Sequence, residues 1–250
     1  MKRLLLALAL VCCAAPAAAE RLVSALSTQQ VLITSGFDGA TLSLFGSIEP
    51  DGPDDAADGP YNVITIVTGP LQDRVTRLKT NVLGIWTNTD DVTFRHFPSF
   101  YAVTASGKLD NIASAEVLAR YTVRPEAQAR AAAIASDLKA DRFGAELVRL
   151  MTEEKHFVLR EDGVRFLSDN AYTASVALPS DVANGPFLVQ TIVLRNGEVV
   201  AERSEGFSVR KSGFENFVFV TSRQQPLLYG LACVLLALGT GWLAGVVFRR

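Results

Sequence analysis

The apolar run at residues 227–248 constrains the fold more than any other feature of this chain. It contains no charged side chain, and Arg249 and Arg250 follow it directly. A helix rises 1.5 Å per residue, so a helix of this length would be roughly 33 Å long, enough to cross a hydrocarbon core of about 30 Å. We therefore predict one transmembrane helix at 227–248.

The opposite end of the chain has the pattern of a secretory signal peptide. Basic residues at positions 2 and 3 precede a short apolar core at 4–11, and small residues at 17–19 precede Glu20. This order of basic, apolar and small residues is typical of a cleaved leader. We predict a signal peptide at 1–19, with cleavage between Ala19 and Glu20.

The two ends together predict the topology. After cleavage the new N-terminus lies outside, and the positive-inside rule places Arg249 and Arg250 in the cytoplasm. An uncleaved leader would put both ends inside and would still export the middle of the chain. We expect a single-pass protein of the bacterial inner membrane, with most of the chain in the periplasm.

Charge and cysteine content exclude several classes of function. Four of the 24 basic residues lie at the two ends, which leaves 20 basic residues against 26 acidic ones, a net charge of −6, for the exported part. No basic cluster is visible, so we expect no nucleic-acid partner. The three cysteines lie in the leader and in the apolar run, so we expect no disulfide and no cysteine-based metal site in the exported part.

Residues 20–106 read as an N-terminal β-rich lobe. Apolar and polar residues alternate over 41–47, and the β-branched run at 63–68 is bounded by Asn62 and Gly69-Pro70. Glycine, proline, asparagine and aspartate recur at short intervals, as in a sandwich or barrel. Further candidate strands are 30–34, 74–79, 82–87 and 100–105.

Residues 107–155 read as a helical segment. They are rich in alanine, with interspersed glutamate, lysine and arginine, which favours helix, and Pro125 suits a first helical position. An approximate apolar stripe follows helical spacing; its members are Ile134, Leu138, Phe143, Leu147 and Leu150. We predict two or three helices packed on one face of a β lobe.

The β pattern returns over 156–210. Asp162-Gly163 and Asn196-Gly197 each separate two apolar runs, which predicts two hairpins. We predict a fold that is mainly β, with a helical insertion and immunoglobulin-like sandwich lobes, followed by a juxtamembrane segment at 211–226 and the helix. Whether the β lobes form two domains or one interrupted sandwich stays open. The juxtamembrane aromatic residues indicate a short helix that lies on the membrane or extends the spanning helix outward.

No catalytic or cofactor motif is visible. The sequence has no nucleophile elbow, phosphate-binding loop or dinucleotide fingerprint. His96 and His156 are isolated and are read as ordinary packed or surface residues rather than as ligands or bases. The acidic run at 49–60 lacks the spacing of a calcium loop and is read as a solvated loop. Trp86 and the aromatic residues at 94–101 could line a groove, although core packing is the commoner fate. We predict no enzyme activity, metal or cofactor.

The strongest candidate contact surface lies within the apolar run. Ala237, Gly241 and Gly245 are four residues apart and share one helix face. Small residues at this spacing let a second helix approach closely in lipid. The alternative is that small residues are simply frequent in membrane helices. The face predicts contact with an integral membrane protein or with a second copy of this chain.

Several sequence blocks resemble a family of alphaproteobacterial transmembrane proteins of unknown activity. The blocks are ERLVSALS (20–27), VLITS (31–35), LFGSIEP (44–50), VLGIWTN (82–88), FPSFY (97–101), KSGFENF (211–217), LYG (228–230), GWLA (241–244) and VFRR (247–250). The resemblance covers nearly the whole chain and implies no catalytic or binding residues. It implies an accessory role beside a sulfite-exporter-type permease. The alternative function is a stand-alone periplasmic module that binds a ligand or senses the envelope.

Overall fold

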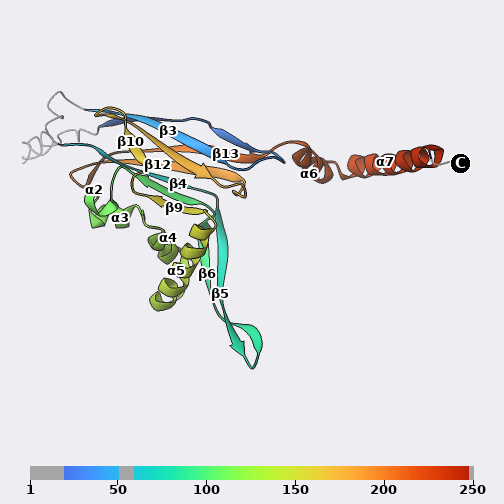
Figure 1. The fold of residues 1–250 in the computed structure, drawn as a ribbon, viewed down its shortest axis with the longest axis horizontal. Helices are drawn as coiled ribbons and strands as arrows, with labels where there is room; N and C mark the ends of the chain where they lie inside the picture. Colours follow the sequence, from blue (N-terminus) through green and yellow to red (C-terminus); the bar gives the residue numbers. More distant parts are fainter. Residues whose placement is uncertain (1–19, 51–58, 248–250) are drawn as a thin grey trace, which may run out of the picture.

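The computed structural model describes residues 20–50 and 59–247 (Figure 1). The predicted signal peptide, most of the acidic run and Phe248 therefore lie outside the described residues. The strands are β1 (Arg21–Leu26), β2 (Gln30–Ile33), β3 (Ala40–Glu49), β4 (Asn62–Thr68), β5 (Leu71–Val82), β6 (Ile85–Pro98), β7 (Tyr101–Ala105), β8 (Ala133–Ile134), β9 (Phe157–Arg160), β10 (Val164–Phe166), β11 (Ala171–Leu178), β12 (Gly185–Arg195) and β13 (Glu198–Lys211). The helices are α2 (Leu109–Ile112), α3 (Ala115–Arg120), α4 (Pro125–Ala132), α5 (Asp137–Glu153), α6 (Phe214–Gln224) and α7 (Pro226–Val247).

The two β-rich stretches form one sandwich. A four-stranded sheet has the order β1-β3-β11-β10, and a six-stranded sheet has the order β2-β13-β12-β4-β7-β9. Each sheet therefore contains strands from before and after the helical segment. This pairing answers the question that the sequence left open: the lobes at 20–106 and 156–210 share one fold, and the helical segment interrupts it.

The central strand β4 shows why the six-stranded sheet is covered on both sides. Val63 and Val67 pack into the core between the two sheets, whereas Ile64 and Ile66 pack into a second core on the opposite face. All four side chains are buried. A continuous apolar run is the pattern of a strand buried on both faces, and it is the run recognised in the sequence at 63–68.

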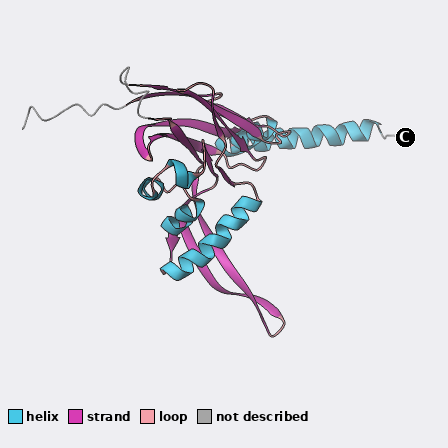
Figure 2. Ribbon diagram, turned by 60° about the vertical axis from the view of Figure 1, so that its left-hand side comes forward, coloured by secondary structure: helices cyan, strands magenta, loops and turns pink. Residues whose placement is uncertain are grey.

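The second core lies beneath the helical layer. Helices α2 to α5 cover the outer face of the six-stranded sheet, opposite the four-stranded sheet (Figures 1 and 2). The buried face of α5 includes Phe143, Leu147 and Met151. The predicted stripe is therefore only partly correct: Leu138 and Leu150 are exposed, and Ile134 lies in β8 rather than in a helix. Pro125 does begin a helix, α4, as predicted.

One predicted hairpin is confirmed and the other is wrong. Strands β12 and β13 pair across Asn196-Gly197, and both turn residues have positive φ, of 54° and 84°. Asp162-Gly163, in contrast, joins β9 of the six-stranded sheet to β10 of the four-stranded sheet. Strand β9 pairs in parallel with β7 instead. A turn dipeptide fixes a local change of direction but does not choose the partner strand.

Strands β5 and β6 form a long hairpin, here called the arm, which projects from the body (Figure 2). Near its base the arm pairs with the short strand β8 and packs against α4 and α5. The turn is at Leu83 and Gly84, which have φ of 52° and 85°. The sequence placed a strand over 82–87; the structure shows that this range contains the turn.

The arm leaves the body at the end from which the membrane helix departs. Strand β13 ends at Lys211 and leads into α6. Thr68, the last residue of β4, pairs with Leu188 of β12, which pairs with Gly206 of β13. The end of β4, from which the chain enters the arm, therefore lies at the same end of the sheet as the end of β13. We call this end of the sandwich the anchor end. Arg195, at the other end of β12, marks the far end, where its guanidinium forms a 2.9 Å ion pair with Glu20.

Helix α7 extends away from the body as a separate element (Figure 1). Its 22 residues have a mean hydropathy of 2.0, and none of the residues in its most apolar window is buried. Gln225 separates it from α6, so the juxtamembrane segment forms its own short helix. The bounds of α7 agree with the predicted span at 227–248 within one residue.

Candidate interaction surfaces

The face of α7 that carries the small residues is open. A Cβ atom added at Gly241 or Gly245 would meet no other atom within 4 Å. Ala237 lies one turn before Gly241 on the same face, since four residues make slightly more than one turn. Small residues at this spacing are of the kind that let a second helix approach closely in lipid. No residue of α7 is buried, so this face has no packing role within the described chain.

The two histidines have different surroundings. His96 lies on β6 with an exposed side chain, and its backbone N–H donates a hydrogen bond to Asp73 Oδ1 at 3.1 Å. His156 is buried directly before β9, with its Nε2 3.1 Å from Asp181 Oδ2. Within 20–50 and 59–247, no group of three or more histidine, cysteine or acidic residues could hold a metal ion. Of the acidic residues in the run at 49–60, the structure describes Glu49, whose Oε2 lies 3.8 Å from Arg21 Nη1.

The aromatic residues at 94–101 are core residues and do not line a groove: Phe94, Phe97 and Tyr101 pack in the second core, and Phe100 packs in the core between the two sheets. Phe94, Phe97 and Tyr101 are fully buried, and the Phe97 ring stacks on Phe157 with centroids 5.2 Å apart. Burial raises the pKa of Tyr101 to about 12. Its hydroxyl donates a hydrogen bond to the carbonyl oxygen of Thr122 at 2.9 Å. These contacts give the aromatic residues a structural role.

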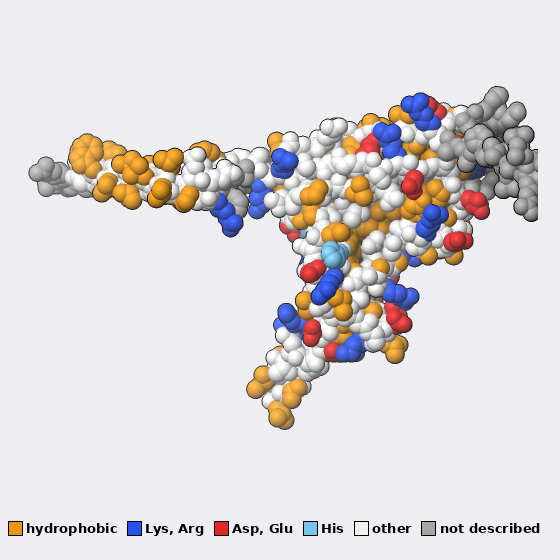
Figure 3. Space-filling view, turned by 180° about the vertical axis from the view of Figure 1, so that it is seen from behind, with side chains coloured by type: hydrophobic (Ala, Val, Ile, Leu, Met, Phe, Trp, Pro, Cys, Tyr) orange, Lys and Arg blue, Asp and Glu red, His pale blue; other side chains and the backbone are white. Residues whose placement is uncertain are grey.

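Trp86 is separated from those aromatic residues and lies near the tip of the arm. Its side chain is 68% exposed, and three further apolar side chains around the turn, Val82, Leu83 and Ile85, are also exposed. We call these four residues the arm tip; Figure 3 shows hydrophobic side chains gathered at the end of the arm. Sequence reasoning missed this cluster. The available signal was the absence of any charged residue over 80–89, around a single glycine.

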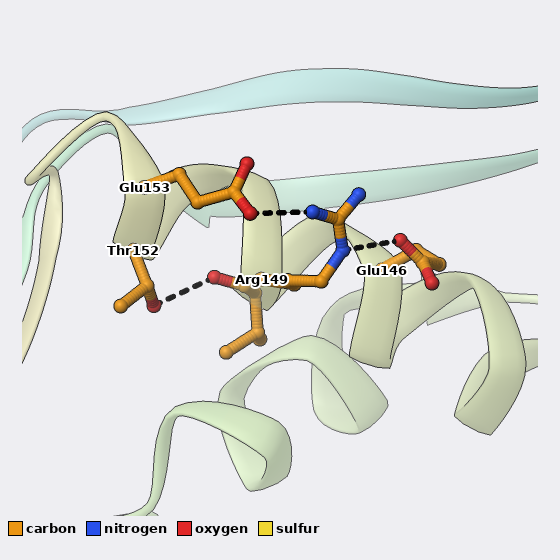
Figure 4. Close-up of polar contacts among 5 residues, drawn as sticks. Glu146, Arg149, Thr152 and Glu153 are labelled. Carbon is orange, nitrogen blue, oxygen red and sulfur yellow. Dashed lines mark hydrogen bonds and ion pairs between the residues drawn. The ribbon is translucent and has the colours of Figure 1, made fainter.

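Polar contacts on α5 illustrate the charges of the helical layer. Arg149 donates hydrogen bonds to Glu146 Oε2 at 2.8 Å and to Glu153 Oε1 at 2.5 Å (Figure 4). The Glu146 hydrogen bond is the largest of the effects that raise the pKa of Arg149. Thr152 donates to the carbonyl oxygen of Val148. All three charged groups are about half exposed. Exposed pairs at i,i+3 and i,i+4 support a helix and supply no reactive group.

The fold and these surfaces define a class: a β-sandwich protein with one C-terminal helix able to cross a membrane. The model of a family described as "Putative transmembrane protein (Alph_Pro_TM)" matches residues 21–250. The chain therefore belongs to this family. No curated protein matches it.

Among the solved structures that match this chain, one shows a weak overall similarity. It is the crystal structure of AggA, the major subunit of aggregative adherence fimbriae type I from Escherichia coli. The match covers 77% of this chain and 95% of AggA, at 7% sequence identity and a TM-score of 0.29. Similarity at this level says nothing about the function of the present chain.

Proposed function

We propose that this protein is a non-enzymatic accessory protein, held at the bacterial inner membrane by α7 with its sandwich in the periplasm. The observation that carries the proposal is a folded β body joined to an apolar helix that no other part of the described chain covers. A helix that only anchors needs hydrophobic length. The open Ala237, Gly241 and Gly245 face adds a surface suited to a second helix.

The partner in this proposal is an integral membrane permease of the sulfite-exporter type. The support is the resemblance of the sequence to its family, together with the small-residue face of α7. Contact between α7 and a permease helix would place the sandwich over the periplasmic mouth of the permease. There the body could stabilise the permease or influence the passage of sulfur oxyanions without performing chemistry.

Purification from the native membrane in mild detergent tests this proposal. The permease should co-purify with the intact chain, and Gly241→Leu or Gly245→Leu should sharply reduce its yield, because a leucine side chain keeps the helix backbones apart. Gly239→Leu is the matched control, since position 239 lies two residues, or about 200°, away from 241 around the helix. Absence of the permease, or an equal loss with Gly239→Leu, would contradict the proposal.

A further inference from the structure

The arm tip exposes apolar side chains for which the body offers no packing. Leu83 is 99% exposed, Trp86 68%, Ile85 67% and Val82 49%. No charged residue occurs over 80–89, so the cluster has no charge of its own. A contiguous exposed apolar cluster, unlike a scattered apolar residue, indicates a contact surface.

The backbone of the turn indicates that Leu83 serves a function other than folding. Leu83 has a φ of 52°, and Gly84 follows with a φ of 85°. Such a turn favours asparagine at the first position, and this chain uses Asn196-Gly197 in the corresponding turn of β12 and β13. A leucine with positive φ is strained. Because the Leu83 side chain is almost fully exposed, packing within the body does not offset the strain.

The position of the arm brings a membrane within reach. The arm leaves the body at the anchor end. Pro70, which directly precedes β5, lies there beside Gly185, the first residue of β12: a Cβ atom added at Gly185 would be 2.7 Å from Pro70 Cγ. Helix α6, between the body and α7, is only about 16 Å long. Strand β5 is about 40 Å long. The arm is therefore longer than α6, the helix that sets the distance between the body and the bilayer.

We propose that the arm tip inserts into the headgroup region of the membrane that α7 crosses, as a second membrane contact. The occupant of this surface is lipid, because the tip combines aliphatic side chains with a tryptophan, the residue enriched at membrane interfaces. Lys79 and Arg77 are exposed on β5 behind the tip, and Asp91 pairs in register with Arg77. Asp90, which pairs in register with Leu78, forms a 2.8 Å ion pair with Lys139 of α5. Lys79, opposite Asn88, is the charge nearest the tip, and its sign suits anionic lipid.

The contact requires the body to tilt toward the bilayer. In Figure 1 the arm points to the side of the α7 axis rather than along it. Two joints allow a change of angle: Gly213, with a φ of 100°, precedes α6, and Gln225 interrupts the helix between α6 and α7. With the tip and α7 both in the membrane, the body would be held at two points instead of turning about one.

Tryptophan fluorescence of the full chain tests the proposal. The chain has two tryptophans, so Trp242→Phe leaves Trp86 as the only reporter. In vesicles of phosphatidylglycerol and phosphatidylethanolamine, we expect blue-shifted Trp86 emission, quenching by brominated acyl chains and protection from acrylamide. Water-like emission with full acrylamide quenching would overturn the proposal. A blue shift that grows with protein density and resists brominated lipid would also overturn it, in favour of contact between copies of the chain.

Two variants separate insertion from folding. Leu83→Asn keeps the turn, since asparagine tolerates positive φ, but it should lower the ratio of inserted to free tip about tenfold. Brominated lipids would then quench Trp86 less, at an unchanged or higher melting temperature. The second variant moves the reporter: Trp86 and Trp242 are both replaced by phenylalanine, and Leu167→Trp supplies the only tryptophan. Leu167 is 60% exposed and lies near the start of β11, at the far end of the sandwich. Equal lipid quenching at position 167 would overturn the proposal.

Discussion

Replacing Gly46 with alanine is expected to destabilise the sandwich far more than so small a change suggests. Gly46 lies in the middle of β3 and pairs in register with Tyr172 of β11. The Tyr172 ring lies over the glycine, so an added Cβ atom would stand 2.3 Å from both Cζ and the hydroxyl oxygen. Real Cβ atoms do not approach other atoms this closely, so either the ring or the strand must move.

The burial of Tyr172 sets the size of the effect. Its side chain is 1% exposed and meets Phe166 edge-on, with ring centroids 6.2 Å apart. Overpacking a core costs about 1–3 kcal/mol, and losing a buried aromatic side chain costs about 3–5 kcal/mol. We expect Gly46→Ala to lower the free energy of unfolding by about 3 kcal/mol. For a body of this size, that corresponds to a fall in melting temperature of about 6–12 °C.

Thermal unfolding of the full chain in mild detergent, followed by near-ultraviolet circular dichroism, measures this effect. Tyr172→Leu removes the atoms that collide, so Gly46→Ala should cost little in that background. The two single variants and the double variant form a cycle, whose coupling free energy should exceed about 1 kcal/mol. A melting temperature unchanged by Gly46→Ala, or additive costs in the cycle, would refute the reasoning.

Three further measurements test the fold and its surfaces. Burial raises the pKa of Tyr101 to about 12 from its ordinary 10.0, so the folded state retains a proton that the unfolded state loses. The free energy of unfolding should therefore fall between about pH 10 and 12, by about 1.4 kcal/mol per pH unit from this group. Denaturant titrations at several pH values should show that the free energy of unfolding falls less steeply with pH in Tyr101→Phe. Leu83→Asn should raise the free energy of unfolding by about 1 kcal/mol by removing backbone strain; a loss of stability would contradict this. Arg149→Ala should leave the melting temperature almost unchanged in a thermal scan, because its ion pairs are exposed; a large decrease would show that these pairs matter more than their exposure suggests.

Local patterns predicted the elements better than the way they assemble. The apolar run at 227–248 and the Asn196-Gly197 turn were readable because chain length and positive φ are local requirements. The partners of β9 and β10 were not readable, because Asp162-Gly163 suits a hairpin equally well and pairing depends on distant strands. The single sandwich was hidden for the same reason, since β3 pairs with β11 across more than a hundred residues.

The candidate surfaces divide in the same way. The small-residue face of α7 follows from helical spacing alone, so it could be predicted from Ala237, Gly241 and Gly245. The arm tip could not, because Leu83-Gly84 lacks the usual residues of a tight turn and reads as the middle of a strand. The exposed position of Trp86 depends on where the arm ends relative to the helical layer, which no local pattern encodes.

Labelling single cysteines in cells tests most directly whether α7 holds an exported body at the membrane. In a chain whose three native cysteines are replaced by alanine, Leu167→Cys reports on the body and Arg250→Cys on the C-terminus. Once the outer membrane has been made permeable, an impermeant maleimide should label position 167 in intact cells. It should label position 250 only after the inner membrane is broken. Labelling of position 250 in intact cells, or protection of position 167, would contradict this topology.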